Sequence, residues 1–313
     1  MLQYLIILLG DASTSYCHYE NKSESDRLIP LDTLREGIRY AMLENLMIQF
    51  VYPETPLPEE YAAVIESIDH SKIKPLGAPL IDEAEVIVTD TLEGFSPIAD
   101  KAYVLRSDKA HFFAAKEEIG KALSSVTRLN VVITDLATMT ESELTQYRET
   151  LDYLADIAEK AYVAGKSPQL NLLTDRMMLD KMNNCDAGWK NIILAPNGKF
   201  YICPAFYHED ESDSVGDLEN GLDIKNPQLY RLDHAPLCRN CDAYQCKRCV
   251  WLNRKTTLEV NTPSHEQCVA AHHERNASRI LLNNIRKHGT FLPERDEIKE
   301  IDYLDPFDVR KEW

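Results

Sequence analysis

Residues 238–249 read Cys-Arg-Asn-Cys-Asp-Ala-Tyr-Gln-Cys-Lys-Arg-Cys, so two Cys-x2-Cys pairs follow each other with only four residues between them. A Cys-x2-Cys pair lets two thiolates reach one metal from a tight loop, and thiolates bind both iron–sulfur clusters and structural zinc. Cysteines that are merely buried have no reason to adopt this spacing. The sequence therefore predicts a metal site in the last third of the chain, with seven candidate ligands: Cys185, Cys203, Cys238, Cys241, Cys246, Cys249 and Cys268.

Charge and the N-terminal sequence limit the possible partners. The 313-residue chain has 51 acidic and 34 basic residues and a net charge of −17, so its field repels a phosphate backbone or an anionic lipid surface. We expect no nucleic acid and no membrane as partners. The apolar run 2–9 is too short to span a bilayer and lacks the basic flank and cleavage site of a signal peptide. We expect a cytoplasmic protein, in which the cysteines stay reduced.

Upstream of the cysteines, short apolar runs alternate with amphipathic segments, which is typical of a parallel β/α architecture. The clearest helix begins with a capping box at Thr140 and Glu143 and ends near Gly165. The expected strands are Tyr4–Leu9, Ile48–Tyr52, Ala84–Thr89, Ala102–Arg106, Leu129–Thr134 and Gln169–Leu172. The sequence thus predicts an α/β protein with a partial parallel β/α barrel over residues 1–178.

The pattern changes after the expected barrel. Residues 191–195 and 199–202 predict two short strands joined by the turn Pro196-Asn197-Gly198, and a helix is expected from Cys268 to Arg286. We therefore expect a small cysteine-rich metal-binding domain over 179–280, followed by a C-terminal tail, 281–313, in which no motif is found.

The cysteine pattern resembles a known family. Gly198 follows Cys185 by thirteen positions and precedes Cys203 by five, and the paired cysteines and the detached Cys268 come after. This order is similar to the seven-cysteine SPASM domain appended to radical SAM peptide-modifying enzymes, although two gaps are each one residue shorter than usual. The resemblance implies one or two 4Fe-4S clusters. It assigns Cys185, Cys203 and Cys249 to the first and Cys238, Cys241, Cys246 and Cys268 to the second.

The loop after the first expected strand, Gly10 to Tyr19, is similar to the loop that carries Cys-x3-Cys-x2-Cys in radical SAM enzymes. Its three ligand positions are Gly10, Thr14 and Cys17, so one thiolate remains. Glu54 stands in the segment corresponding to the family's Gly-Gly-Glu-Pro motif, which lacks the glycines here. The resemblance leaves Cys17 and Glu54 as candidate cofactor-binding residues. Because one thiolate cannot hold a four-iron cluster, we predict that the chain alone does not cleave S-adenosylmethionine.

Two function classes stay open. The whole chain, from YLIILL and SYCHYEN to the cysteine pairs, also resembles proteins called CXXX repeat peptide maturases, which implies a ribosomally made precursor peptide rich in cysteine as partner. In this class the chain is a radical SAM/SPASM-like peptide maturation protein with a degenerate SAM motif. Whether it is itself an enzyme or serves an active partner enzyme is left open, and no catalytic residue is identified.

The alternative is a zinc-stabilised binding or adaptor protein without catalysis. Cys268 and His272 lie four residues apart, on one face of the expected helix, and with the cysteine pairs they would complete a tetrahedral zinc site. The ligand types alone do not decide between zinc and iron–sulfur.

Overall fold

The computed structural model describes residues 2–179, 184–239, 241–244, 246 and 249–298. Four positions of the cysteine loop, 240, 245 and 247–248, and the end of the expected tail, 299–313, lie outside the described residues. The chain forms two compact units that interleave along the sequence. Unit 1 comprises Met1–Thr89 and Cys185–His234, and unit 2 comprises Asp90–Asn184 and Ala235–Trp313. The domain boundaries expected from the sequence, after 178 and after 280, stay predictions.

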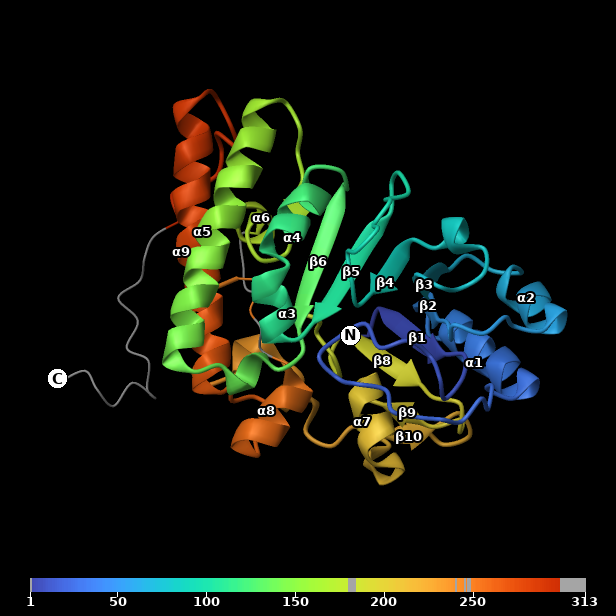
Figure 1. The fold of residues 1–313 in the computed structure, drawn as a ribbon. Helices are drawn as coiled ribbons and strands as arrows, with labels where there is room; N and C mark the ends of the chain where they lie inside the picture. Colours follow the sequence, from blue (N-terminus) through green and yellow to red (C-terminus); the bar gives the residue numbers. More distant parts are fainter. Residues whose placement is uncertain (1, 180–183, 240, 245, 247–248, 299–313) are drawn as a thin grey trace. The chain divides into compact units, whose positions relative to one another are not determined.

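Unit 1 is built on a sheet with the strand order β4-β3-β2-β1-β8-β9 (Figure 1). The strands are β1 (Tyr4–Leu8), β2 (Met47–Val51), β3 (Ser71–Pro75), β4 (Val86–Thr89), β8 (Asn191–Leu194) and β9 (Phe200–Tyr201). Strand β1 pairs in parallel with β2 on one side and β8 on the other. Leu5, Ile7 and Leu8 are completely buried, as expected for a parallel strand covered on both faces.

The remaining elements of unit 1 are short. They are α1 (Leu31–Leu43), α2 (Glu59–Ile65), α7 (Pro204–Glu209), the antiparallel pair β10 (Gly216–Asp217) and β11 (Gly221–Leu222), and the 3-10 helices Ile81–Glu83, Glu211–Asp213, Pro227–Tyr230 and Leu232–His234. Gly37 of α1 lies against Leu194 of β8, and a Cβ at this glycine would come within 2.3 Å of the leucine side chain. The glycine therefore allows α1 to approach the sheet closely.

The sequence pattern missed strand β3. Its residues Lys72 and Lys74 are 7% and 4% exposed, although lysine is rarely buried. The ammonium of Lys72 lies 2.6 Å from Glu66 and 3.0 Å from Glu83, and that of Lys74 donates to the main-chain carbonyls of Pro79 and Leu80. Because two buried positions carry charge that is compensated by residues from other elements, the strand has no apolar pattern of its own.

The predicted strand pair at 191–195 and 199–202 is present as β8 and β9, which run antiparallel. Gly198 in the turn has φ +77°, a conformation that glycine adopts without strain. The pattern did not predict that β8 also pairs in parallel with β1, so that this hairpin extends the main sheet of unit 1.

The described part of unit 2 has three parallel strands in the order β7-β6-β5, namely β5 (Ala102–Ser107), β6 (Arg128–Ile133) and β7 (Gln169–Leu170). Its helices are α3 (Lys109–Ala114), α4 (Lys116–Leu123), the 3-10 helix Leu136–Thr138, α5 (Glu141–Val163), α6 (Thr174–Met178), α8 (Val250–Thr257) and α9 (His265–Lys287). The predicted capping box at Thr140 is confirmed. Helices α5 and α9 lie side by side, joined by a hydrogen bond from the buried hydroxyl of Tyr147 to the carboxylate of Glu274 (Figure 1).

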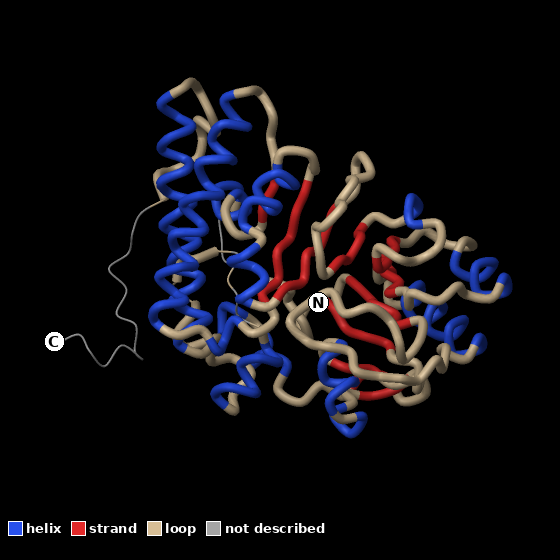
Figure 2. The backbone as a smooth tube through the Cα atoms, viewed as in Figure 1, coloured by secondary structure: helices blue, strands red, loops and turns tan. Residues whose placement is uncertain are grey.

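The predicted mixed α/β class with parallel strands is confirmed in both units, and Figure 2 shows the strands of each unit with helices against them. No helix in the described part of the chain has the length and apolar character needed to cross a membrane.

Candidate metal centre and the loop after the first strand

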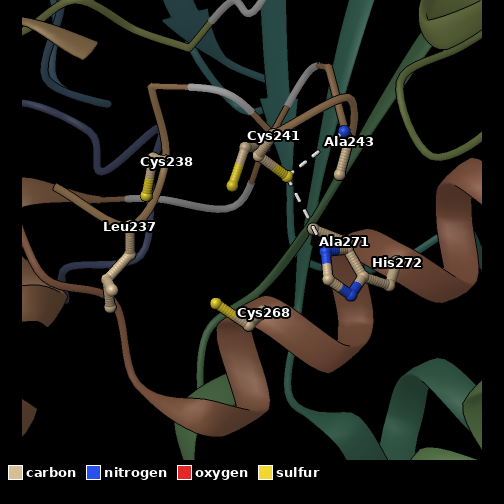
Figure 3. A pocket seen from close by; sticks show the side chains of 8 residues that line it. Leu237, Cys238, Cys241, Ala243, Cys268, Ala271 and His272 are labelled. Atoms are coloured by element: carbon tan, nitrogen blue, oxygen red, sulfur yellow. Dashed lines mark hydrogen bonds between the residues drawn. The ribbon is translucent and has the colours of Figure 1, made fainter. Parts of the chain in front are cut away.

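The candidate metal centre is a pocket in unit 2 between a cysteine-bearing loop and helix α9. It is lined by Leu237, Cys238, Cys241, Ala243, Cys246, Cys268, Ala271 and His272. In Figure 3 the sulfur atoms of Cys238, Cys241 and Cys268 face the same hollow, which the imidazole of His272 approaches from the helix. The four cysteines are the set that the family resemblance implies for the second cluster.

Helix α9 places Cys268 in its first turn. A capping box fixes this end, because Ser264 Oγ accepts from the Gln267 N–H (3.3 Å) and Gln267 Oε1 accepts from the Ser264 N–H (2.9 Å). Gln267 is completely buried and its side-chain amide also donates to Asn253 Oδ1 of α8 at 3.1 Å. The capping box therefore fixes the position of Cys268 in the first turn of α9.

The loop that carries Cys241 is anchored through the next residue, Asp242. Its carboxylate accepts a hydrogen bond from Arg275 Nη1 at 2.7 Å, and its main-chain carbonyl accepts one from Arg176 Nε at 2.7 Å. The Arg176 guanidinium also lies over the Tyr244 ring, 4.1 Å from its centre. Arg275 and Arg176 are 4% and 5% exposed, so two buried guanidinium groups share one carboxylate beside the pocket.

Two nitrogen atoms lie near the sulfur of Cys241, His272 Nε2 at 3.7 Å and the Ala243 amide nitrogen at 3.4 Å. Burial raises the pKa of the Cys241 thiol, and the Ala243 N–H and the guanidinium groups of Arg275 and Arg176 only partly offset this. A metal must therefore displace a proton from this thiol, and we expect binding to strengthen as the pH rises.

The donors of this pocket fit a 4Fe-4S cluster, which is usually held by four cysteine thiolates. They also fit zinc, because zinc accepts any combination of thiolate and imidazole that gives four ligands. In the described part of the chain, no three His, Cys, Asp or Glu side chains are gathered as ligands of a single ion. Ligation by Cys238, Cys241, Cys246 and Cys268 stays a prediction.

The three cysteines implied for a first cluster fall on both units. Cys185 is exposed and Cys203 is the N-cap residue of α7, both in unit 1, whereas Cys249 is the N-cap residue of α8 in unit 2. Burial raises the pKa of Tyr16 well above its usual value, and Cys17, Cys203 and Cys185 raise it further. Three thiols of unit 1, those of Cys17, Cys185 and Cys203, thus act on the hydroxyl of Tyr16. Joint ligation of a cluster by Cys185, Cys203 and Cys249 stays a prediction.

The loop after β1 does not fit a four-iron cluster. Gly10 forms a β-bridge with Leu28, and a Cβ on it would lie 3.1 Å from the Arg27 carbonyl oxygen and 3.2 Å from Leu28 Cδ2. A side chain at position 10 would therefore point into the backbone of the same loop. The Thr14 N–H donates to the Tyr52 carbonyl (2.9 Å), and Cys17 is partly exposed.

A polar cluster around Asp11 holds this loop closed. The buried carboxylate accepts hydrogen bonds from Tyr207 Oη (2.5 Å), Ser25 Oγ (2.8 Å) and the guanidinium of Arg27 (2.9 and 3.2 Å). Arg27 also donates to Tyr207 Oη at 3.0 Å. Burial alone would raise the pKa of Asp11, but the hydrogen bonds from Tyr207, Arg27 and Ser25 outweigh it and lower the pKa. No sequence pattern indicated this cluster, since Tyr207 lies 196 positions from Asp11.

The other candidate cofactor residue, Glu54, is exposed just after β2. Its carboxylate lies against Gly77, where an added Cβ would come within 2.3 Å of Glu54 Oε1. The glycine leaves room for the carboxylate, and a role of Glu54 in cofactor binding stays a prediction.

Comparison with solved structures identifies the fold. Native anSMEcpe with bound AdoMet and Kp18Cys peptide aligns with a TM-score of 0.62 and 11% identity, covering 91% of this chain and 99% of that one. The same protein with AdoMet and Cp18Cys peptide gives 0.61 and 12%, with 91% and 99% covered, and its histidine-tagged form with AdoMet gives 0.60 and 11%, with 91% and 96% covered. The chain thus has the radical SAM-like fold that the resemblance implied. No family model and no curated protein matches it.

We predict that Asp11→Asn destabilises the protein at neutral pH by about 1–3 kcal/mol, because charge-assisted hydrogen bonds become neutral ones. The folded-state pKa of Asp11 lies below its ordinary value of 3.8, so the stabilisation is present above that value and lost as the pH falls through the folded-state pKa. Urea unfolding of both proteins should therefore give curves that converge in acid. Asp26→Asn changes an exposed residue of the same loop and should leave the free energy of unfolding almost unchanged. If Asp11→Asn lowers the free energy of unfolding by the same amount at every pH, the ionised carboxylate of Asp11 does not stabilise the loop.

We also predict that Cys241→Ala is far more damaging than Cys17→Ala. Loss of a ligand leaves the metal under-coordinated and releases the loop beside Asp242, which costs several kcal/mol in structural metal sites. Cys17→Ala removes one partly exposed side chain and should be mild. Thermal melts with metal content measured on the same samples compare the two, and equal small shifts with metal retained would show that Cys241 is not a ligand.

Proposed function

We propose that this protein takes part in the maturation of a ribosomally made peptide, carries an iron–sulfur cluster in unit 2, and does not perform radical SAM chemistry by itself. The observation that carries the proposal is the convergence of Cys238, Cys241, Cys246 and Cys268 on one pocket, in a chain with a radical SAM-like fold. When bound, the cluster would supply one-electron transfer. The chain's own contribution is to fix the ligands, through Gln267 on α9 and Asp242 in the loop.

A precursor peptide is the proposed partner. Two of the solved structures with the same fold hold a peptide together with AdoMet, which supports peptide binding as the use of this architecture. The resemblance to CXXX repeat peptide maturases makes the substrate a cysteine-repeat peptide. A separate active enzyme would then supply the radical step. A further cluster on Cys185, Cys203 and Cys249 belongs to the same proposal.

The second candidate is a zinc-stabilised adaptor, and one distance favours it. A tetrahedral zinc ion with a sulfur at about 2.3 Å and a nitrogen at about 2.0 Å places these two atoms roughly 3.5 Å apart. The Cys241 sulfur and His272 Nε2 lie 3.7 Å apart. The pocket also has four cysteines in its lining, which is the number that a 4Fe-4S cluster needs without the histidine.

We predict that the anaerobically reconstituted chain does not cleave S-adenosylmethionine reductively. Only Cys17 remains of the motif, and residue 10 faces the backbone of Arg27. Gly10→Cys/Thr14→Cys should not restore cleavage, because the Cβ of a cysteine at position 10 would be crowded at 3.1 Å from the Arg27 carbonyl oxygen. 5′-Deoxyadenosine formation with dithionite as reductant is the measurement. Product above background that disappears in Cys17→Ala would contradict the prediction.

For the peptide we predict that a labelled synthetic peptide with four Cys-x3 repeats binds the reconstituted chain in fluorescence anisotropy. The same peptide with every cysteine replaced by serine is the matched control and should bind at least tenfold more weakly if thiols are recognised. Equal binding of the two peptides, or none by either, would contradict the proposed substrate class.

A further inference from the structure

One face of α9 brings three different groups to the cysteine loop. Cys268, His272 and Arg275 follow each other at spacings of four and three, so they project from the same side of the helix. Cys268 and His272 line the pocket, and Arg275 holds the carboxylate of Asp242. The helix therefore contributes more to the pocket than a single ligand.

Of these groups, His272 lies next to the sulfur of Cys241. His272 Nε2 lies 3.7 Å from its sulfur and the Ala243 amide nitrogen lies 3.4 Å from it, both within hydrogen-bonding range of a sulfur acceptor. Asp242, the next residue, is held by Arg275 at 2.7 Å, which fixes the position of the sulfur relative to the helix. Helix α9 thus positions both the imidazole of His272 and, through Arg275, the loop that carries Cys241.

Hydrogen bonds to a ligating sulfur withdraw electron density from it and favour the more negative, reduced form of a cluster. Buried positive charge acts in the same direction, and here Arg176 and Arg275 share the carboxylate of Asp242. The hydrogen bonds and the positive charge both lie at Cys241 or at the residue next to it. A cluster in this pocket would therefore be easier to reduce than its four thiolates alone would make it.

Resting on the proposed iron–sulfur function, we propose that His272 is a positioning residue that donates a hydrogen bond from Nε2 to the Cys241 sulfur and raises the reduction potential of the cluster without binding iron. This hydrogen bond requires an N–H donor at position 272, and it does not require a side chain that binds metal. A glutamine amide can supply such a donor, whereas a leucine of similar bulk cannot.

The test uses the full chain, reconstituted anaerobically with iron and sulfide and titrated with dithionite against redox dyes. His272→Leu should keep its iron and lower the reduction potential so that the reduction equilibrium falls about tenfold, which is about 59 mV for one electron. His272→Gln should retain most of the wild-type potential. His273→Leu, a change at the neighbouring position on a different side of α9, should leave the potential unchanged.

Each outcome decides between the possibilities. An unchanged potential in His272→Leu with iron retained overturns the inference alone. Loss of iron from His272→Leu, with a thermal melt showing that the protein is folded, makes His272 a ligand and also overturns it. Wild-type protein that takes up zinc and no iron overturns the proposed function together with this inference.

Discussion

The candidate metal centre depends on the way in which buried charge ties the cysteine loop to helix α9. Asp242 is buried and so are Arg176 and Arg275, and a buried charge is tolerated only when it is paired and hydrogen-bonded. Removing Asp242 would leave two buried guanidinium groups without the carboxylate that they share. The pairing therefore fixes the loop against the helix face that carries Cys268 and His272, and the position of the Cys241 sulfur follows from it.

A second polar cluster has a comparable role in unit 1. Where a radical SAM enzyme would have three thiolates after the first strand, this chain closes the loop with Asp11, Arg27 and Tyr207. The bridge between Gly10 and Leu28 leaves little space for a side chain at position 10. The loop is thus held by hydrogen bonds, and a metal is not needed to order it.

Sequence patterns predicted the elements whose signals are local. The capping box at Thr140, the turn at Gly198 and the parallel strands with apolar runs are all present. Strand β3 was missed because Lys72 and Lys74 are buried with partners from other elements. The pairing of β8 with β1 was missed because it joins residues nearly 190 positions apart, and no local pattern records such a contact.

In the candidate site, too, the features with a local sequence signal could be predicted, and those that arise from contacts between distant residues could not. Cysteine spacing was enough to propose the ligands, because paired thiolates have a recognisable spacing. Asp242 and Arg275 carry no such signal, since their importance arises from burial and from a contact across 33 positions. Asp11 is likewise distinguished from the many acidic residues of the surface only by the groups that surround it in the folded chain.

The central claim is that the pocket of Cys238, Cys241, Cys246 and Cys268 holds an iron–sulfur cluster and not a zinc ion. X-ray absorption at the iron and zinc edges of the anaerobically reconstituted chain tests it most directly, because it identifies the metal and its neighbours together. We predict iron bound by sulfur alone, with iron–iron scattering from a cluster. Zinc bound by sulfur at about 2.3 Å and by nitrogen at about 2.0 Å would contradict the claim.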